Sequence, residues 1–107
     1  IYPREIEDFL YTHDKINAAE VVGVKDIEAN ETPVAYLELK EGVTATEKEI
    51  KDFLKPLLAP FKQPRKIYFM EKLPRNATGK ILKRELRELA NSSKYGIIHY
   101  YGDMEFA

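Results

Sequence analysis

The segment TEKEIKDFLKPLLAP, residues 46–60, constrains the fold of this chain more than any other part of the sequence. Thr46 and Glu49 stand three residues apart, which is the spacing of a capping box at a helix N-terminus. Apolar residues then recur at the three- and four-residue steps of a helical stripe: Ile50, Phe53, Leu54, Leu57 and Leu58. Pro56 lies inside the stripe and should bend or interrupt the helix. The pattern predicts a helix that buries one face against the rest of the protein.

Shorter patterns on both sides predict a small sheet and two more helices. Small and β-branched residues, bounded by turn residues, favour strands over 16–26, 34–42 and 65–70. Helical spacing predicts helices over 1–13, with Pro3 in the first turn, and over 81–91. We therefore expect an α+β domain in which two to three helices pack on one face of a three-stranded sheet. A hairpin or a strand from the tail, whose YGIIHYY has strand composition, could extend that sheet.

Composition excludes several classes of protein. The 107 residues, 44% of them hydrophobic, suit one compact domain with a buried core. Seventeen basic and eighteen acidic residues leave a net charge of -1, which argues against a dedicated nucleic-acid binder. Cysteine is absent, which excludes disulfides and thiolate metal sites and leads us to expect a cytoplasmic location. No apolar run reaches membrane-span length, and because Ile1 opens inside a helical pattern we expect a piece of a longer polypeptide.

The stretch PRNATGK, residues 74–80, surrounds one lysine with residues that shape the backbone. A phosphate-binding loop would need a glycine five residues before Gly79 and a serine or threonine after Lys80. Pro74 and Ile81 occupy those positions, so that interpretation fails. Two interpretations of Lys80 stay open on residue types alone, an ordinary surface lysine before a helix and a lysine whose charge is aimed at a substrate.

Other polar groups have simpler explanations. The two histidines, His13 and His99, lie far apart without a companion motif, so we expect no metal site and place His13 at the edge of an apolar helix face. The helical carboxylates are interpreted as solvated faces: Glu5, Glu7, Asp8, Glu47, Glu49 and Asp52. A basic cluster could hold phosphates, although solvation is the commoner role: Lys55, Lys62, Arg65 and Lys66.

The wider sequence around Lys80 resembles a known family. LPRNATGKILKRELRE is similar to the C-terminal signature of the adenylate-forming enzymes, which include acyl-CoA synthetases, peptide synthetase adenylation domains and firefly luciferase. IYPREIED resembles the end of the motif that opens their small C-terminal domain, and AAEVVGVKD and FKQPRKIYFMEKLPR match the family's internal pattern. The resemblance extends over about residues 1–90 and is greatest to bacterial fatty acyl-CoA synthetases. The family's large N-terminal domain is absent, and the tail matches no family pattern.

The resemblance implies that this chain and an N-terminal domain have different roles in one enzyme. Residues 1–91 would form the C-terminal lid domain, and 92–107 an unassigned tail. The absent N-terminal AMP-binding domain, the main partner, would bind most of the ATP and Mg²⁺ and the acid, expected to be a fatty acid. Lys80 would bridge the carboxylate and the α-phosphate during adenylation, a step at which a preorganised cation stabilises developing charge. The lid would then rotate to present another face to coenzyme A. The fragment alone would be inactive.

For the coenzyme A face, the resemblance implies that Gly23 lies near the pantetheine tunnel and that Lys55 and Lys62 meet phosphates. Two alternatives stay open. The chain could belong to another adenylating enzyme, such as an aryl-CoA ligase or a peptide synthetase module. It could also be a stand-alone, non-catalytic interaction module. Neither nucleic acid nor a membrane span enters any of these interpretations.

Overall fold

A computed structural model describes residues 3–25, 28 and 30–92 of the chain. The elements follow in the order α1 (Pro3–Tyr11), β1 (Ile16–Lys25), β2 (Glu31–Leu39), α2 (Glu47–Leu54), the 3₁₀ helix η1 (Pro60–Lys62), β3 (Lys66–Phe69) and α3 (Lys83–Ser92). Apart from the short η1, this is the order that the sequence predicts. The strand expected in the tail, and His99 with it, lie outside the described residues.

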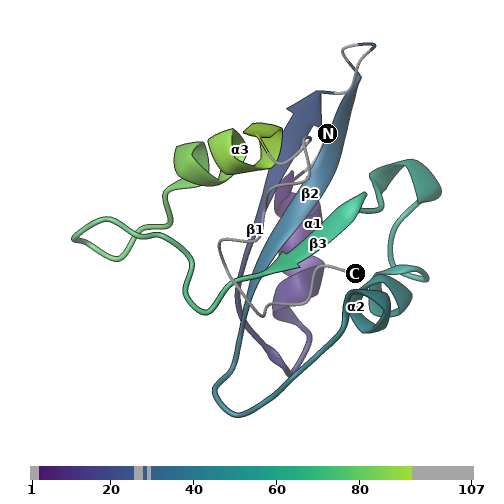
Figure 1. Ribbon diagram of the computed structural model, residues 1–107. Coiled ribbons are helices and arrows are strands. Elements are labelled where there is room, and N and C mark those ends of the chain that lie inside the picture. The colour runs from purple at the N-terminus through teal and green to yellow at the C-terminus, as the bar shows by residue number, and fades with distance from the viewer. Residues whose placement is uncertain (1–2, 26–27, 29, 93–107) are drawn as a thin grey trace.

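The three strands form one mixed sheet in the order β1-β2-β3. β1 and β2 pair antiparallel, whereas β2 and β3 pair parallel, with Tyr36 opposite Tyr68. A parallel pair needs a crossover connection, and α2 and η1 lie within the one that joins β2 to β3 (Figure 1). These three helices and three strands confirm the predicted α+β class.

Helices cover both faces of the sheet, so the expectation of a single covered face is wrong. Successive strand residues point to opposite faces. One face packs on α1 and α2 through the cluster that contains Ile6, Leu10, Val21, Leu37, Ile50, Leu54 and Ile67. The other packs on α3 through the cluster that contains Val22, Tyr36, Tyr68, Leu86 and Ala90, and Figure 1 shows α1 and α3 on opposite sides of β1. The physical reason lies in β2, where residues 33–38 are all buried and both faces need a cover.

Both features predicted for α2, its N-terminal cap and its interruption near Pro56, are confirmed. The Thr46 side chain accepts a hydrogen bond from the Glu49 N–H at 3.1 Å. The helix ends at Leu54, and Lys55 still has helical backbone with φ of −54° and ψ of −48°. It goes no further because Pro56 has no N–H to continue the hydrogen bonds of the helix, and its ring would clash with the carbonyl four residues earlier. Leu58 is nevertheless buried, whereas Leu57, at 38% exposure, is not.

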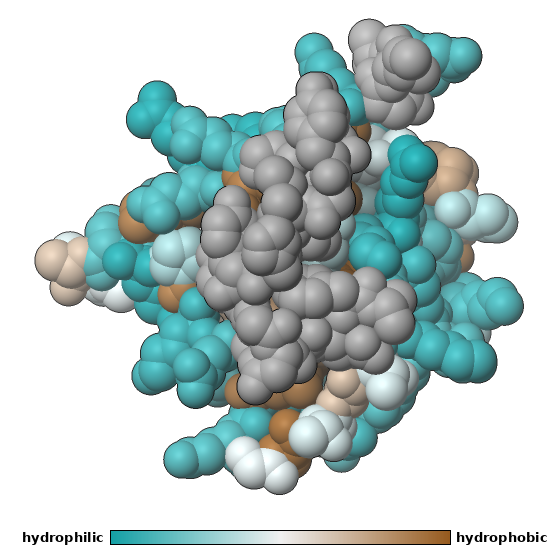
Figure 2. All heavy atoms as spheres, in the orientation of Figure 1, coloured by the Kyte–Doolittle hydropathy of each residue, from teal (hydrophilic) through white to brown (hydrophobic). Residues whose placement is uncertain are grey.

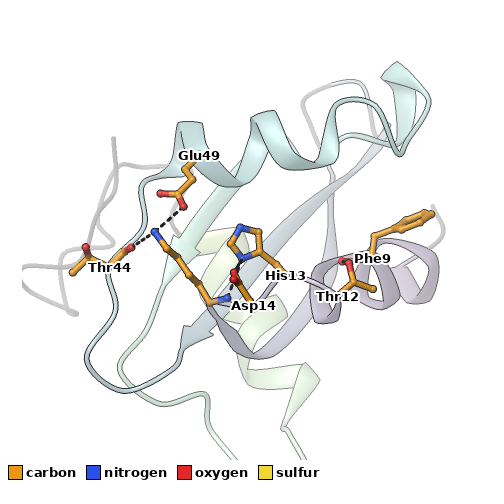
Figure 3. Close-up of polar contacts among 7 residues, drawn as sticks. Phe9, Thr12, His13, Asp14, Thr44 and Glu49 are labelled. Carbon is orange, nitrogen blue, oxygen red and sulfur yellow. Dashed lines mark hydrogen bonds and ion pairs between the residues drawn. The ribbon is translucent and has the colours of Figure 1, made fainter.

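The turn after α1 is tied to the start of α2 by Lys15, and Figure 3 labels three of the residues around this lysine, His13, Thr44 and Glu49. Lys15 Nζ donates to the Thr44 carbonyl at 2.9 Å and to Glu49 Oε2 at 2.8 Å. Beside it, His13 Nδ1 accepts the Lys15 N–H at 3.1 Å, and the imidazole packs edge-on against Phe53 with ring centroids 4.7 Å apart. His13 therefore lies at the edge of the apolar layer, as the sequence predicts.

Both outer edges of the sheet are capped by a glutamate from a helix. Glu7 Oε2 in α1 accepts the Val21 N–H of β1 at 2.8 Å, and Glu47 Oε2 in α2 accepts the Ile67 N–H of β3 at 3.1 Å. The interpretation of these carboxylates as solvated is therefore wrong for Glu47, which is buried, and for Glu7, whose side chain is only 17% exposed. Each satisfies a strand N–H that would otherwise lack a partner at a sheet edge.

Hydrophilic side chains dominate the visible periphery of the described residues (Figure 2). None of the helices in the described ranges has the length and apolar character that crossing a membrane requires.

Candidate active site at the Lys80 hairpin

Between β3 and α3 the chain extends away from the sheet and returns as a short hairpin (Figure 1). Arg75 and Ile81 form an antiparallel bridge. Above it, the Asn76 N–H donates to the Lys80 carbonyl at 2.9 Å, and the Gly79 N–H donates to the Asn76 carbonyl at 2.9 Å. This pattern matches a three-residue hairpin loop that ends in a glycine bulge. The backbone of Lys80 is thus part of a defined turn.

The side chain of Asn76 organises the inside of that turn. Its Oδ1 accepts the N–H groups of Thr78 and Lys80, both at 3.0 Å, and the Thr78 hydroxyl at 2.7 Å. Gly79 has φ of +90°, a region in which a side chain would be strained. The asparagine and glycine therefore fix the backbone on the N-terminal side of Lys80 without contacting its ammonium.

The Lys80 side chain itself is left available. The residue is exposed, and among the described residues its ammonium has no hydrogen-bond or ion-pair partner. It lines a groove of about 560 Å³ together with Tyr11, Asn17, Ala18, Glu20, Arg75, Gly79, Ile81 and Lys83. Arg75, Lys80 and Lys83 are cationic and Glu20 is acidic, but Arg75 pairs with Glu38 and Lys83 pairs with Glu20. Among the described residues of the groove, Lys80 is therefore the cation left to attract an anionic group.

One side of the hairpin is anchored at its base by Glu38 of β2. Glu38 Oε1 accepts the Leu73 N–H at 2.9 Å and Arg75 Nη1 at 3.0 Å, and its Oε2 accepts Asn17 Nδ2 at 2.7 Å. The Glu38 side chain is only 10% exposed. Burial alone would raise its pKa, but these hydrogen bonds outweigh burial and hold the pKa of Glu38 below its usual value. Glu38 is thus ionised at neutral pH.

The other side is anchored through Lys83, the first residue of α3. Lys83 Nζ lies 3.2 Å from Glu20 Oε2 in β1 and 3.8 Å from Glu7 Oε2 in α1. Burial raises the pKa of Glu7, and the neighbouring Glu20 raises it further, while the Val21 N–H and Lys83 lower it. The net direction is upward. Two carboxylates thus share one lysine where α3 begins.

The structure places the other predicted residues away from this groove. None of Gly23, Lys55 and Lys62 is among the residues that line it. Gly23 lies in β1, where a Cβ would come within 2.6 Å of the Glu31 side chain. Lys62 Nζ pairs with Glu5 Oε1 at 3.0 Å. Lys55 lines a separate groove of about 510 Å³ beside α2. Their coenzyme A roles therefore stay predictions.

Sequence reasoning missed Asn17, Glu20, Glu38 and Lys83. A signal existed for Glu38, because in VAYLEL its charge falls on the same strand face as the buried Tyr36. No comparable signal marks Asn17, whose side chain is redirected by a register shift between Ile16 and Ala18. Among the described residues no group of three or more histidine, cysteine or acidic side chains could hold a metal ion.

Comparison with known proteins agrees with these features. A family model of the AMP-binding enzyme C-terminal domain matches residues 5–80. The mitochondrial medium-chain acyl-CoA ligase of Danio rerio is 51% identical over 88 residues, which are 82% of this chain and 14% of that relative. The long-chain-fatty-acid–CoA ligase of Bacillus subtilis is 44% identical over 88 residues, 82% of this chain and 16% of that relative.

Solved structures give the same result. ATP-bound MatB from Rhodopseudomonas palustris superposes with a TM-score of 0.76 at 34% identity, over 82% of this chain and 18% of that one. The fatty acyl CoA synthetase of Mycobacterium tuberculosis gives 0.76 at 34%, over 86% of this chain and 18% of that one. The family match runs from α1 through every strand of the sheet to Lys80, the last residue that it includes. This chain therefore belongs to the family of C-terminal domains of AMP-binding enzymes.

Proposed function

We propose that this chain is the C-terminal domain of an ATP-dependent acyl-CoA ligase, an acid–thiol ligase, and that Lys80 acts in its adenylation step. The observation that carries the proposal is the contrast at Lys80, whose backbone is fixed by Asn76 while its ammonium has no partner among the described residues. A cation held in this way can stabilise negative charge that develops on a bound substrate. Relatives whose names specify acyl-CoA ligases support the reaction class.

The chemistry of the first step explains why a lysine suits this position. A carboxylate oxygen attacks the α-phosphorus of ATP and forms a new P–O bond. The bond between that phosphorus and the oxygen bridging to the β-phosphate breaks, and its electron pair leaves with pyrophosphate. Both reactants are anionic, so the Lys80 ammonium would offset their repulsion and stabilise the charge in the transition state. Its compact charge on a long stem suits a bridging position.

The remaining components are assigned to the rest of the enzyme. The chain spans 14% and 16% of the two ligases compared above, so most of such an enzyme would lie outside it. We assign ATP, Mg²⁺ and the acid mainly to an N-terminal AMP-binding domain, which would be the partner of residues 1–91. Residues 92–107 would form a tail outside the lid. The fragment alone should therefore release no pyrophosphate from ATP, fatty acid and coenzyme A, and turnover by the isolated chain would contradict this assignment.

In the second step the thiol of coenzyme A loses its proton and its sulfur attacks the acyl carbonyl carbon. The C–S bond forms, and the bond from that carbon to the AMP oxygen breaks with its electron pair leaving on AMP. We assign Gly23, Lys55 and Lys62 to the coenzyme A side. Lys55 is exposed beside Lys48 and Lys51 and could meet a phosphate directly. Lys62 would have to exchange Glu5, 3.0 Å away, for that phosphate. Lys55→Ala should therefore raise the KM for coenzyme A more than Lys62→Ala does.

The acid is proposed to be a fatty acid, because medium-chain and long-chain ligases are among the relatives. An aryl-CoA ligase is the second candidate, favoured by a 2-succinylbenzoate–CoA ligase from Geobacillus that is 36% identical over 98 residues. Comparing kcat/KM for octanoate and benzoate in the complete enzyme separates the two. A cytoplasmic location is proposed for the enzyme, and a fluorescent fusion would distinguish it from the mitochondrial location that some relatives' names specify.

The decisive experiment compares both half-reactions of the complete enzyme with Lys80→Ala. Losing one preorganised charge costs about 3–4 kcal/mol, so acyl-AMP formation should fall on the order of a hundredfold to a thousandfold. Transfer from supplied acyl-AMP to coenzyme A should stay within about tenfold of normal, since the lysine is not used there. Lys80→Arg should not restore adenylation, because a planar fork cannot replace a point charge.

Lys72→Ala is the matched control, because Lys72 is an exposed lysine of the same β3–α3 connection that does not line the Lys80 groove. It should leave both half-reactions unchanged. Equal losses in both half-reactions for Lys80→Ala would indicate misfolding or misdocking. An undiminished adenylation rate in Lys80→Ala would show that Lys80 is an ordinary surface lysine.

A further inference from the structure

The geometry points to Glu38 as the positioning residue for Lys80, an inference that rests on the proposed role of Lys80 in adenylation. Glu38 does not line the groove beside the lysine. It lies beneath the hairpin, in the central strand of the sheet, and binds the segment through which the hairpin leaves the domain. Its carboxylate would therefore set where Lys80 stands relative to the sheet.

Three donors from two separate segments converge on this carboxylate. Leu73 N–H and Arg75 Nη1 belong to the outgoing arm of the hairpin and contact Oε1 at 2.9 and 3.0 Å. Asn17 Nδ2 belongs to β1 and contacts Oε2 at 2.7 Å. With the Glu38 side chain only 10% exposed, water cannot readily replace these partners. Glu38 therefore joins the outgoing arm of the hairpin to the sheet.

β1 has a bulge at the residue that contacts Glu38. Ile16 pairs with Leu39 and Ala18 with Glu38, so Asn17 is the extra residue of a bulge in the antiparallel pair. A regular strand would direct residue 17 away from the face on which Ala18 lies. The bulge instead lets the Asn17 amide reach Glu38. A strand bulge and a buried carboxylate thus occur at the same place, and a regular strand pair with apolar side chains would not need either of them. We therefore connect both features with the hairpin that Glu38 binds.

All three groups that contact Glu38 are donors, which explains why a carboxylate is present. An ionised carboxylate accepts hydrogen bonds with both oxygens. A glutamine has one oxygen and no charge, so its NH₂ group would face either the hairpin donors or Asn17, whose amide would then have to rotate. Hydrogen bonds within the hairpin couple its outgoing arm to its returning arm. The Leu82 N–H donates to the Pro74 carbonyl at 2.9 Å, and Arg75 bridges Ile81. Moving residues 73–75 would therefore move both arms and Lys80 with them.

The test uses the complete enzyme with Glu38→Gln. A displacement of about 1 Å can cost on the order of a hundredfold in rate, so we expect acyl-AMP formation to fall about tenfold to a hundredfold. The loss should appear in kcat rather than in the KM for ATP, because substrate binding is assigned elsewhere. Transfer from supplied acyl-AMP to coenzyme A should change by less than about threefold, well under the tenfold that 1.4 kcal/mol represents.

Glu47→Gln is the matched control. Glu47 is also a buried glutamate that accepts a backbone N–H, that of Ile67 at 3.1 Å, but it lies in α2 and has no contact with the hairpin among its hydrogen bonds and ion pairs. It should lower stability without separating the two half-reactions. If Glu38→Gln does not fold, Asn17→Ala removes only one donor and should show the same selectivity with a severalfold loss. Selectivity in neither variant, or the same selectivity in Glu47→Gln, would overturn the inference.

A double-mutant cycle distinguishes this inference from the proposed function. If Glu38 acts through Lys80, then Glu38→Gln should have almost no further effect on adenylation once Lys80 is alanine. Independent, multiplying losses would refute the positioning role while leaving the role of Lys80 intact. A Lys80→Ala enzyme with normal adenylation would instead refute the proposed function itself.

Discussion

Glu38 and Glu7 lie at the two sides on which the Lys80 hairpin is attached to the domain, and they differ in their electrostatics. Each is largely removed from water, with side-chain exposures of 10% and 17%, and each accepts a backbone N–H. The pKa of Glu38 is nevertheless lowered from its usual value, whereas the pKa of Glu7 is raised. Burial acts in the same direction on both, so their neighbours decide the sign.

The number and kind of neighbours account for the difference. Glu38 receives three donors, one of them the Arg75 guanidinium, and faces no second carboxylate among its hydrogen bonds and ion pairs. Glu7 receives one N–H and a lysine at 3.8 Å that lies closer to Glu20. The negative charge of Glu38 is therefore fully hydrogen-bonded. Around Glu7, two carboxylates face one lysine, so negative charge is in excess. Removing the charge of Glu38 should lower stability, whereas removing the charge of Glu7 should not.

The largest expected effect on folding is that of Glu38→Gln in the 107-residue chain. Hydrogen bonds to charged groups contribute about 1.5–3 kcal/mol, and an amide would meet these three donors with one uncharged oxygen, so unfolding in urea at pH 7 should require less free energy by roughly that amount. Asp52→Asn, at an exposed carboxylate on α2, provides the control and should stay within about 0.5 kcal/mol. A similarly small loss for Glu38→Gln would mean that the hairpin base is not anchored there.

The same substitution should have a smaller, pH-dependent consequence. Because the folded pKa of Glu38 is below the usual value of 4.5, its ionised form stabilises the fold above that value, and the contribution is lost as pH falls through the folded pKa. The stability difference between the wild type and Glu38→Gln should therefore be constant above about pH 6 and shrink below pH 4.5. Urea unfolding at several pH values measures it. A difference that grows on acidification would contradict the lowered pKa.

These anchors also show where sequence reasoning succeeds and fails. The cap at Thr46 was predictable because its hydrogen bond is local, three residues along the chain. The contacts of Glu38 join residues 21 to 37 positions apart, and those of Glu47 depend on β3 packing beside α2, which no local pattern encodes. Charged residues in amphipathic helices are usually solvated, so the half-buried Glu7 and the buried Glu47 were misassigned for a general reason.

The Lys80 hairpin shows the same contrast between local features, which the sequence predicts, and long-range contacts, which it does not. Its turn residues Asn76 and Gly79, and the lysine that follows them, were evident in the sequence because turn chemistry is local. The base on which it stands was not evident, because the bulge at Asn17 arises from the pairing of two strands. The placement of α3 on the face opposite α1 and α2 likewise depends on the whole sheet.

The smallest expected effect, and the one with the opposite sign, belongs to Glu7→Gln. Because the folded pKa of Glu7 is above its usual value of 4.5, ionisation of Glu7 costs stability as pH rises through that range. Glutamine keeps an oxygen for the Val21 N–H, removes the repulsion from Glu20 and leaves Lys83 paired with Glu20 at 3.2 Å. We expect the free energy of unfolding at pH 7 to be unchanged or to rise by up to about 1 kcal/mol, and this gain to vanish below pH 4.5, where the wild-type carboxyl is protonated.

Asp8→Asn, at an exposed carboxylate of the same helix, controls for the loss of one negative charge. A loss of more than about 1 kcal/mol for Glu7→Gln, comparable to that of Glu38→Gln, would show that Glu7 is held as firmly ionised as Glu38 and that the two anchors are alike.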